Sequence, residues 1–313
     1  MSIVTATVTA ETVAVPARRR GGFWHLARNP KAVVGLVIFL LFTVMALWPG
    51  LFTAVSDPNA LEFMPSEQPS GEHILGTTAL GQDIWAQLVF GARQSLAIAV
   101  VAGGCATVLS VLVGVTAAYL GGIVDDILSL LTNAILVIPA FPLIIIFAKY
   151  AGQGGLPVIL AVLVFTGWSY GANQLRAQAL SLRSRDFLES ARVRGERRSY
   201  IIVAEVLPNL ASLIVANFLG AALYSVLTAA GLQFLGLGDP NSVSWGTMLY
   251  WSQNQQALQT GMPLWSLAPG LCVALLGASF ALVNYAFDEI SNPALRPVRR
   301  HRVRRSRQRT DLA

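Results

Sequence analysis

Long runs of apolar residues constrain this 313-residue chain more than any other feature. A helix needs about 20 mainly apolar residues to cross the hydrocarbon core of a bilayer. The chain holds windows of this kind at 32–52, 96–119, 127–147, 156–173, 210–232 and 264–287. Only 12% of its residues are charged. The sequence therefore predicts an all-α, polytopic membrane protein with about six transmembrane helices, the third of them kinked at Pro139 and Pro142.

The charged residues are segregated along the chain. Lys and Arg gather before the first window, between Arg176 and Arg198, and after Arg296, whereas acidic residues gather in 56–91. Loops rich in Lys and Arg stay on the cytoplasmic side, so we predict that both termini and the central basic segment are cytoplasmic. The net charge of +6 then reflects topology and contact with anionic membrane lipid, and no nucleic-acid partner is predicted.

These patterns divide the chain into five segments. We expect a cytoplasmic tail over 1–31 that ends in a candidate interfacial helix, a first transmembrane helix over 32–52, an external segment over 53–92, a five-helix core over 93–290 that contains a central elbow at 184–207, and an Arg-rich cytoplasmic tail over 291–313.

The central elbow is a charged island between the fourth and fifth windows. Asp186 followed three residues later by Glu189 predicts a capping box and the start of a short helix. Gly195 predicts the C-terminal cap of that helix, because glycine readily adopts φ > 0. A second helical piece from Ser199 is predicted to end just before Pro208, which disfavours the α conformation in the residue that precedes it.

The elbow also carries a resemblance to a known family. Glu189-Ser190-Ala191, Gly195 and Leu207-Pro208-Asn209 resemble the EAA motif of permease subunits of binding-protein-dependent ABC importers, with Ser190 and Glu205 departing from the usual residues. The resemblance implies a type I importer permease fold with a cytoplasmic coupling helix. It places Asp186, Glu189, Ser190, Ala191, Gly195, Glu196 and Tyr200 at the contact with an ATPase. Spacing alone also allows a simple capped helix with a solvated basic face.

Other runs narrow the resemblance to one branch of the family. Residues 73–83 and 91–96 resemble the HxLGTDxxGRD and GARxSL elements of the second, or C-subunit, permeases of dipeptide and oligopeptide importers, with Thr78 and Gln82 departing from the pattern. Residues 234–238 and 244–246 resemble the SFLGLG and SWG elements of the same branch. Glycines that simply serve tight turns are the structural alternative.

The chemistry expected of the chain itself is sparse. No G-x-x-x-x-G-K-[ST] phosphate loop and no hydrolase motif occur in the sequence, so we predict a subunit that is not an enzyme and binds no cofactor. The three histidines and two cysteines have no ligand-like spacing, and no metal site is predicted. The resemblance implies a homologous second permease, two ATPase subunits that bind ATP and Mg²⁺, and an external solute-binding protein.

The polar residues inside the apolar windows are mostly neutral. Those that are candidates to line a path for a polar solute are Asn133, Asn217, Tyr224, Ser225, Thr228 and Asn284. Interhelical hydrogen bonds explain the same residues equally well. We predict a multi-pass permease of the cytoplasmic membrane for di- or oligopeptides. Nickel or glutathione are alternative solutes, and a proton-driven carrier is the weaker alternative because such carriers usually hold acidic or His residues at mid-membrane.

Overall fold

The computed structural model describes residues 29–150 and 155–291. The candidate interfacial helix and almost all of the Arg-rich tail lie outside these residues. The described helices are α2 (Pro30–Leu47), the short η1 (Pro49–Leu51), α3 (Ile84–Leu120), α4 (Gly122–Val137), α5 (Ala140–Tyr150), α6 (Gly155–Arg183), α7 (Asp186–Val193), α8 (Arg198–Tyr200), the π-helical η2 (Ile201–Val206), α9 (Leu207–Phe234), α10 (Trp245–Asn254) and α11 (Pro263–Ser291).

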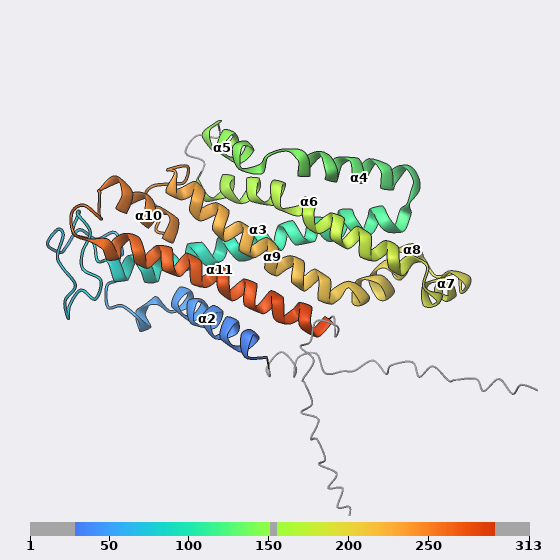
Figure 1. Ribbon diagram of the computed structural model, residues 1–313, viewed down its shortest axis with the longest axis horizontal. Helices are drawn as coiled ribbons and strands as arrows, with labels where there is room; N and C mark the ends of the chain where they lie inside the picture. Colours follow the sequence, from blue (N-terminus) through green and yellow to red (C-terminus); the bar gives the residue numbers. More distant parts are fainter. Residues whose placement is uncertain (1–28, 151–154, 292–313) are drawn as a thin grey trace, which may run out of the picture.

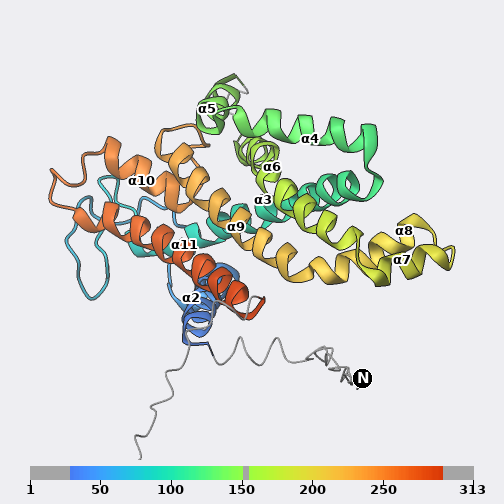
Figure 2. The ribbon, with the colours of Figure 1, turned by 45° about the vertical axis from the view of Figure 1, so that its right-hand side comes forward.

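Long helices run side by side through the molecule (Figure 1). Helices α3, α6, α9 and α11 form the bundle, and α2 and the α4–α5 pair flank it on opposite sides (Figure 2). Five of the described helices are long and apolar enough to cross a membrane, counting α8 to α9 as one, and the bent α4–α5 pair makes a sixth if it is one span. The prediction of an all-α polytopic protein with about six spans is confirmed.

The third predicted span is broken rather than gently kinked. Helices α4 and α5 meet at 83°, and Ile138 between them is extended, with φ −68° and ψ 126°. The next residue is Pro139, and a proline disfavours the α conformation of the residue before it. The predicted kink is thus confirmed as a full break of the helix.

Two helix boundaries at the end of the bundle opposite the elbow differ from the expected windows. Helix α2 ends at Leu47 instead of reaching residue 52, because Pro49 starts a separate 3₁₀ turn. Helix α3 begins at Ile84 instead of residue 96, since the Asp83 side chain accepts the Ala86 N–H at 2.7 Å as an N-cap. Polar residues in the first turns of α3 interrupt the apolar run, so hydropathy alone missed this part of the helix.

Helix α10 lies between the predicted windows at 210–232 and 264–287, where no helix was predicted. Ser244 caps it through a complete capping box with Thr247. Trp245 is fully buried, and its indole Nε1 donates to the Leu88 carbonyl of α3 at 2.9 Å. The SWG run therefore fixes α10 against the N-terminal part of α3.

Small residues allow the long helices to approach one another closely. A Cβ on Gly103 of α3 would lie 2.8 Å from the Cα of Ala222 in α9, and a Cβ on Gly114 would overlap the Ala172 carbonyl of α6. A Cβ on Gly35 of α2 would lie 2.9 Å from the Ser279 carbonyl of α11. Close packing of this kind is a main source of stability between helices in lipid, where apolar burial gives little.

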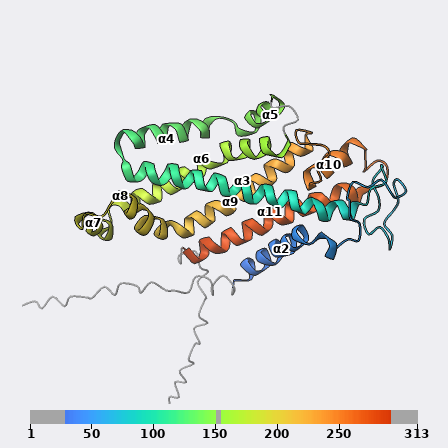
Figure 3. The ribbon, with the colours of Figure 1, turned by 180° about the vertical axis from the view of Figure 1, so that it is seen from behind.

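The two ends of the bundle differ. The elbow at α7 lies at one end, and the long segment before α3 lies with α10 at the other (Figure 3). The start of α2 and the end of α11 point toward the elbow end, and Lys31 lies 4.0 Å from the centre of the Tyr285 ring.

Candidate functional sites: an exposed elbow and a polar cavity

The elbow begins with α7, but its N-terminal cap is not the predicted one. Helix α7 starts at Asp186 as expected, yet the N-cap residue is Arg185 and no side chain caps it. Asp186 and Glu189 lie within the first turn. The predicted capping box is therefore wrong, and the two carboxylates favour the helix through its dipole instead.

The predicted C-terminal cap at Gly195 is confirmed. Gly195 has φ +76°. Its N–H donates to the Arg192 carbonyl at 2.9 Å, and the N–H of Glu196 donates to the Ala191 carbonyl at 3.2 Å. These two hydrogen bonds form a Schellman motif, which requires a left-handed residue at this position. Gly195 thus sets the direction in which the chain leaves α7.

The second arm of the elbow was predicted to end before Pro208, but it continues past this residue. Helix α8 passes through η2 into α9, and Leu207 keeps an α conformation. The Leu207 N–H donates to the Ile202 carbonyl, five residues back, so a wide π turn leads into the proline. Asn209 Nδ2 donates to the Glu205 carbonyl at 2.6 Å. Pro208 has no N–H to donate within a helix, and the wider turn before it accommodates the proline without ending the helix.

Helix α7 is fixed to the rest of the chain by one face only. Leu188 and Ala191 are buried, and they belong to a cluster that also contains Ile201 of the second arm. Most of the residues that were predicted to contact an ATPase are exposed, namely Asp186, Glu189, Ser190, Gly195 and Tyr200. Glu196 is half-buried. Ala191 is fully buried, so its side chain packs inside the elbow and does not lie on the exposed face.

An ion pair joins α4 to α6 on the elbow side of the bundle. Arg176 donates from Nε to Asp125 Oδ1 at 2.6 Å and from Nη2 to Asp125 Oδ2 at 2.8 Å. A second polar contact between the same helices runs from Asn173 Nδ2 to Asn133 Oδ1 at 3.1 Å. These contacts hold α4, of which little is buried, against the bundle.

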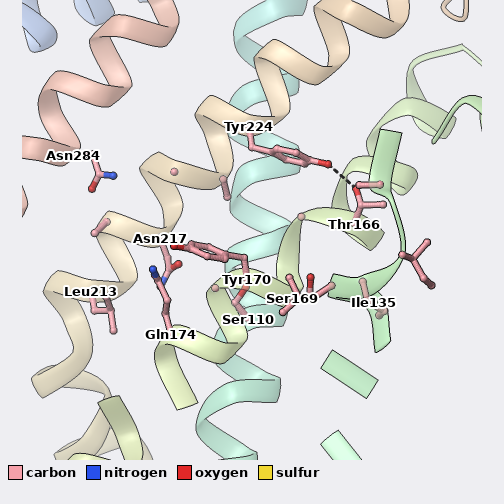
Figure 4. A pocket seen from close by; sticks show the side chains of 18 residues that line it. Ser110, Ile135, Thr166, Ser169, Tyr170, Gln174, Leu213, Asn217, Tyr224 and Asn284 are labelled. Carbon is pink, nitrogen blue, oxygen red and sulfur yellow. Dashed lines mark hydrogen bonds between the residues drawn. The ribbon is translucent and has the colours of Figure 1, made fainter. Parts of the chain in front are cut away.

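A cavity of about 580 Å³ lies among the helices, with α4 and α5 along one side (Figure 4). Its polar lining residues are Ser110, Thr166, Ser169, Tyr170, Gln174, Asn217, Tyr224 and Asn284. They come from α3, α6, α9 and α11. None of the described residues that line the cavity is charged.

The cavity brings together three of the six predicted path residues, namely Asn217, Tyr224 and Asn284. Of the other three, Asn133 is exposed and bonded to Asn173, while Ser225 and Thr228 do not line the cavity. Sequence reasoning missed the contribution of α6. Its Gly167, Tyr170, Gly171 and Gln174 have the spacing of a single helix face.

Some polar groups of the cavity already have partners, and others do not. Ser110 Oγ bonds the Trp168 carbonyl at 2.6 Å, and the Tyr224 hydroxyl lies 3.4 Å from Thr166 Oγ1. By contrast, Asn217 Nδ2 and Asn284 Oδ1 are buried atoms without a hydrogen-bond partner. These two atoms are enclosed by the surrounding helices and are left without a hydrogen bond.

The 73–83 run forms a compact turn before α3. His73 Nδ1 lies 2.7 Å from Asp83 Oδ2, and both side chains are buried. Gly76 and Gly81 have φ +81° and +82°. Asp83 thus ties the turn to His73 and caps α3 with its other oxygen, and the glycines serve the tight turns that were the structural alternative for them.

Comparison with known proteins finds a matching family and several relatives. The family described as "Binding-protein-dependent transport system inner membrane component" matches residues 110–297. The oligopeptide transport system permease protein OppC of Mycobacterium tuberculosis is 33% identical over 278 residues, which cover 87% of this chain and 94% of that protein. The dipeptide transport system permease protein DppC of Alkalihalophilus pseudofirmus is 30% identical over 279 residues, covering 88% and 90%. The glutathione transport system permease protein GsiD of Pectobacterium atrosepticum is 28% identical over 278 residues, covering 88% and 91%.

Proposed function

The chain belongs to the family of binding-protein-dependent transport system inner membrane components, whose members are transport subunits rather than enzymes, and on this premise we propose that it forms half of a peptide-conducting path in the cytoplasmic membrane. The observation that carries the proposal is the match over most of the chain to permeases named for oligopeptide and dipeptide transport. The similarity to the permease named for glutathione transport is lower.

In this proposal the elbow is the site at which an ATPase subunit moves the bundle. Helix α7 lies at one end of the molecule, with Glu189 and Ser190 exposed and Leu188 buried beneath them. A partner can therefore grip the exposed face, while the buried face passes the movement to α9. The positive-inside rule supports a cytoplasmic position for the elbow and both termini.

The remaining partners follow from the same proposal. A homologous second permease completes the path, two ATPase subunits bind ATP and Mg²⁺, and an external binding protein delivers the peptide at the end that carries α10. The sequence has no phosphate-binding loop, so we expect this chain to bind no nucleotide itself.

The test is peptide uptake by the complete complex in proteoliposomes, with binding protein and peptide outside and ATP inside. We expect ATP-dependent uptake of di- or oligopeptides by the parent complex and its loss in Glu189→Lys at unchanged assembly. Glu62→Lys, which reverses an exposed acid in the segment before α3, at the end of the molecule opposite the elbow, is the matched control. A parent complex that takes up no peptide would refute the proposed solute, and full uptake by Glu189→Lys would refute its role in coupling.

A further inference from the structure

Helix α4 forms one wall of the cavity but is only loosely packed against the bundle (Figure 2). Ile135 and Leu136 of α4, with Ile138 directly after it, line the cavity. Thr132 is the one buried residue among the 16 residues of α4, all of which the structure describes. In lipid, apolar contacts contribute little to holding helices together. The position of α4 therefore depends mainly on its polar contacts and on its two ends.

Both ends of α4 are breaks in the helical structure. At its start, Gly121 has φ 67° and ψ −170°, a conformation that is essentially restricted to glycine, and Gly122 has φ 58°. At its other end, Ile138 is extended before Pro139, and α5 leaves at 83° to α4. Movements between rigid elements are absorbed at a few residues at the ends of elements. Helix α4 is therefore able to move as one unit between these two breaks.

Two polar contacts fix α4 to α6. The stronger one is the pair of hydrogen bonds that Arg176 donates to the two carboxylate oxygens of Asp125, at 2.6 Å and 2.8 Å. Paired, charge-assisted hydrogen bonds of this kind are among the strongest between side chains. The other is the bond from Asn173 to Asn133 at 3.1 Å. The ion pair is thus the strongest polar contact that keeps α4 against α6.

Arg176 belongs to the part of α6 that packs on the elbow. Its neighbours Leu175 and Ala179 lie in one buried cluster with Leu188 and Ala191 of α7. Helix α6 also ends only a short turn before α7 begins. No described residue of α4 belongs to this cluster. A movement of α7 is therefore passed directly to Arg176, whereas it reaches α4 through the ion pair and the glycine turn.

We propose that Asp125 and Arg176 are positioning residues of the transport cycle, and that their ion pair is a latch that holds α4 against α6 until movement of the elbow releases it. This inference rests on the proposed function and deepens it, because it connects the elbow to one wall of the cavity. Release of the latch moves α4 away from α6 and opens the cavity on that side.

The first test joins α4 to α6 without altering the ion pair. Asn133→Cys and Asn173→Cys are introduced into a complex whose native cysteines have been replaced, and the two thiols are linked by a short, reducible cross-linker. Peptide uptake by the complete complex in proteoliposomes, with binding protein and peptide outside and ATP inside, is measured before linking, after linking and after reduction. We expect linking to abolish uptake and reduction to restore it.

Lys31→Cys with Tyr285→Cys is the matched control, because it links α2 to α11 at a contact of 4.0 Å that does not have to open. Linking of this pair should leave uptake unchanged. Full uptake with the 133–173 link in place, or equal arrest by both links, would overturn the inference and leave the proposed function intact. A parent complex that takes up no peptide would instead refute the proposed function.

The second test asks whether the ion pair is the contact that holds α4, and it requires no peptide uptake. Spin labels are placed at the exposed positions Leu130 of α4 and Phe165 of α6, and their distance distribution is measured in the complete complex with ATP and binding protein present. We expect a shorter and a longer distance. Asp125→Asn should raise the ratio of the longer to the shorter state roughly 2- to 10-fold, the size of one net hydrogen bond.

Asp126→Asn is the matched control for the ion pair, because it removes the charge of the next residue, whose side chain is exposed. Its ratio of the two states should stay at the parental value. A single distance in the parent, or the same ratio in Asp125→Asn as in the parent, would overturn the inference.

Discussion

Substitution of Gly195 tests whether the direction of the elbow matters for coupling. Gly195 has φ +76°, and a Cβ built there meets nothing within 4 Å. Any effect of a side chain at this position therefore arises from the backbone conformation and not from a clash. Asparagine tolerates the left-handed conformation best among the other residues, alanine tolerates it less, and a β-branched residue such as valine is a true outlier there.

The magnitude follows from the strain and from what opposes it. A left-handed conformation costs a residue with a Cβ about 1–2 kcal/mol, which lowers the population of the native elbow roughly 5- to 30-fold. Burial of the Leu188 side chain holds α7 in place with about 1.5–3 kcal/mol. We therefore expect Gly195→Asn to keep most of the uptake, Gly195→Ala to lose part of it, and Gly195→Val to lose nearly all.

The assay is ATP-dependent peptide uptake, normalised to the amount of assembled complex in the membrane. Gly71→Val is the matched control, since a Cβ at Gly71 is also free of contacts and its φ is not positive. Equal uptake by the three Gly195 variants would refute the argument from conformation. Loss of uptake in Gly195→Asn as large as in Gly195→Val would show that a side chain of any kind is excluded there, for example by a bound ATPase.

Three further predictions concern the packing of α3 against α6, the 73–83 turn and the membrane topology. Gly114→Ala should lower the stability of the protein by about 1–3 kcal/mol and reduce its abundance in the membrane, because its Cβ overlaps α6. Gly104→Ala in the same helix is the control and should behave as the parent, since the nearest neighbour of its Cβ is 4.0 Å away. Equal abundance of the two variants would refute the close packing. Asp83→Ala should make the 73–83 turn, which is predicted to be external, sensitive to protease added to spheroplasts, because it removes both the α3 cap and the partner of a buried histidine. Parental resistance would contradict this. Ser190→Cys, in a chain without the two native cysteines, should react with an impermeant thiol reagent only after the membrane is opened, and labelling of intact cells would overturn the predicted topology.

Local patterns predicted the elbow well wherever one residue decides the conformation. Gly195 ends its helix as predicted, because a Schellman motif requires a conformation that glycine adopts most easily. The start of α7 was predicted for the wrong reason, since Asp186 lies inside the first turn rather than at the cap. Pro208 gave the wrong boundary, because a π turn of the preceding residues accommodates a proline without ending the helix. A one-residue change in hydrogen-bond spacing leaves no clear pattern in the sequence.

The sequence predicted that neutral polar residues line the cavity, but it did not predict which residues these are. In a soluble helix the polar face marks the outside, so periodicity shows which residues meet. In a membrane helix the lipid-facing side is as apolar as the packed side, and this guide is lost. Polar residues such as Asn217 and Ser225 are then equal candidates, although Ser225 is buried away from the cavity lining. What separates them is helix packing, since Gly171 leaves room beside α3 for the Asn217 amide and so allows Asn217 to line the cavity.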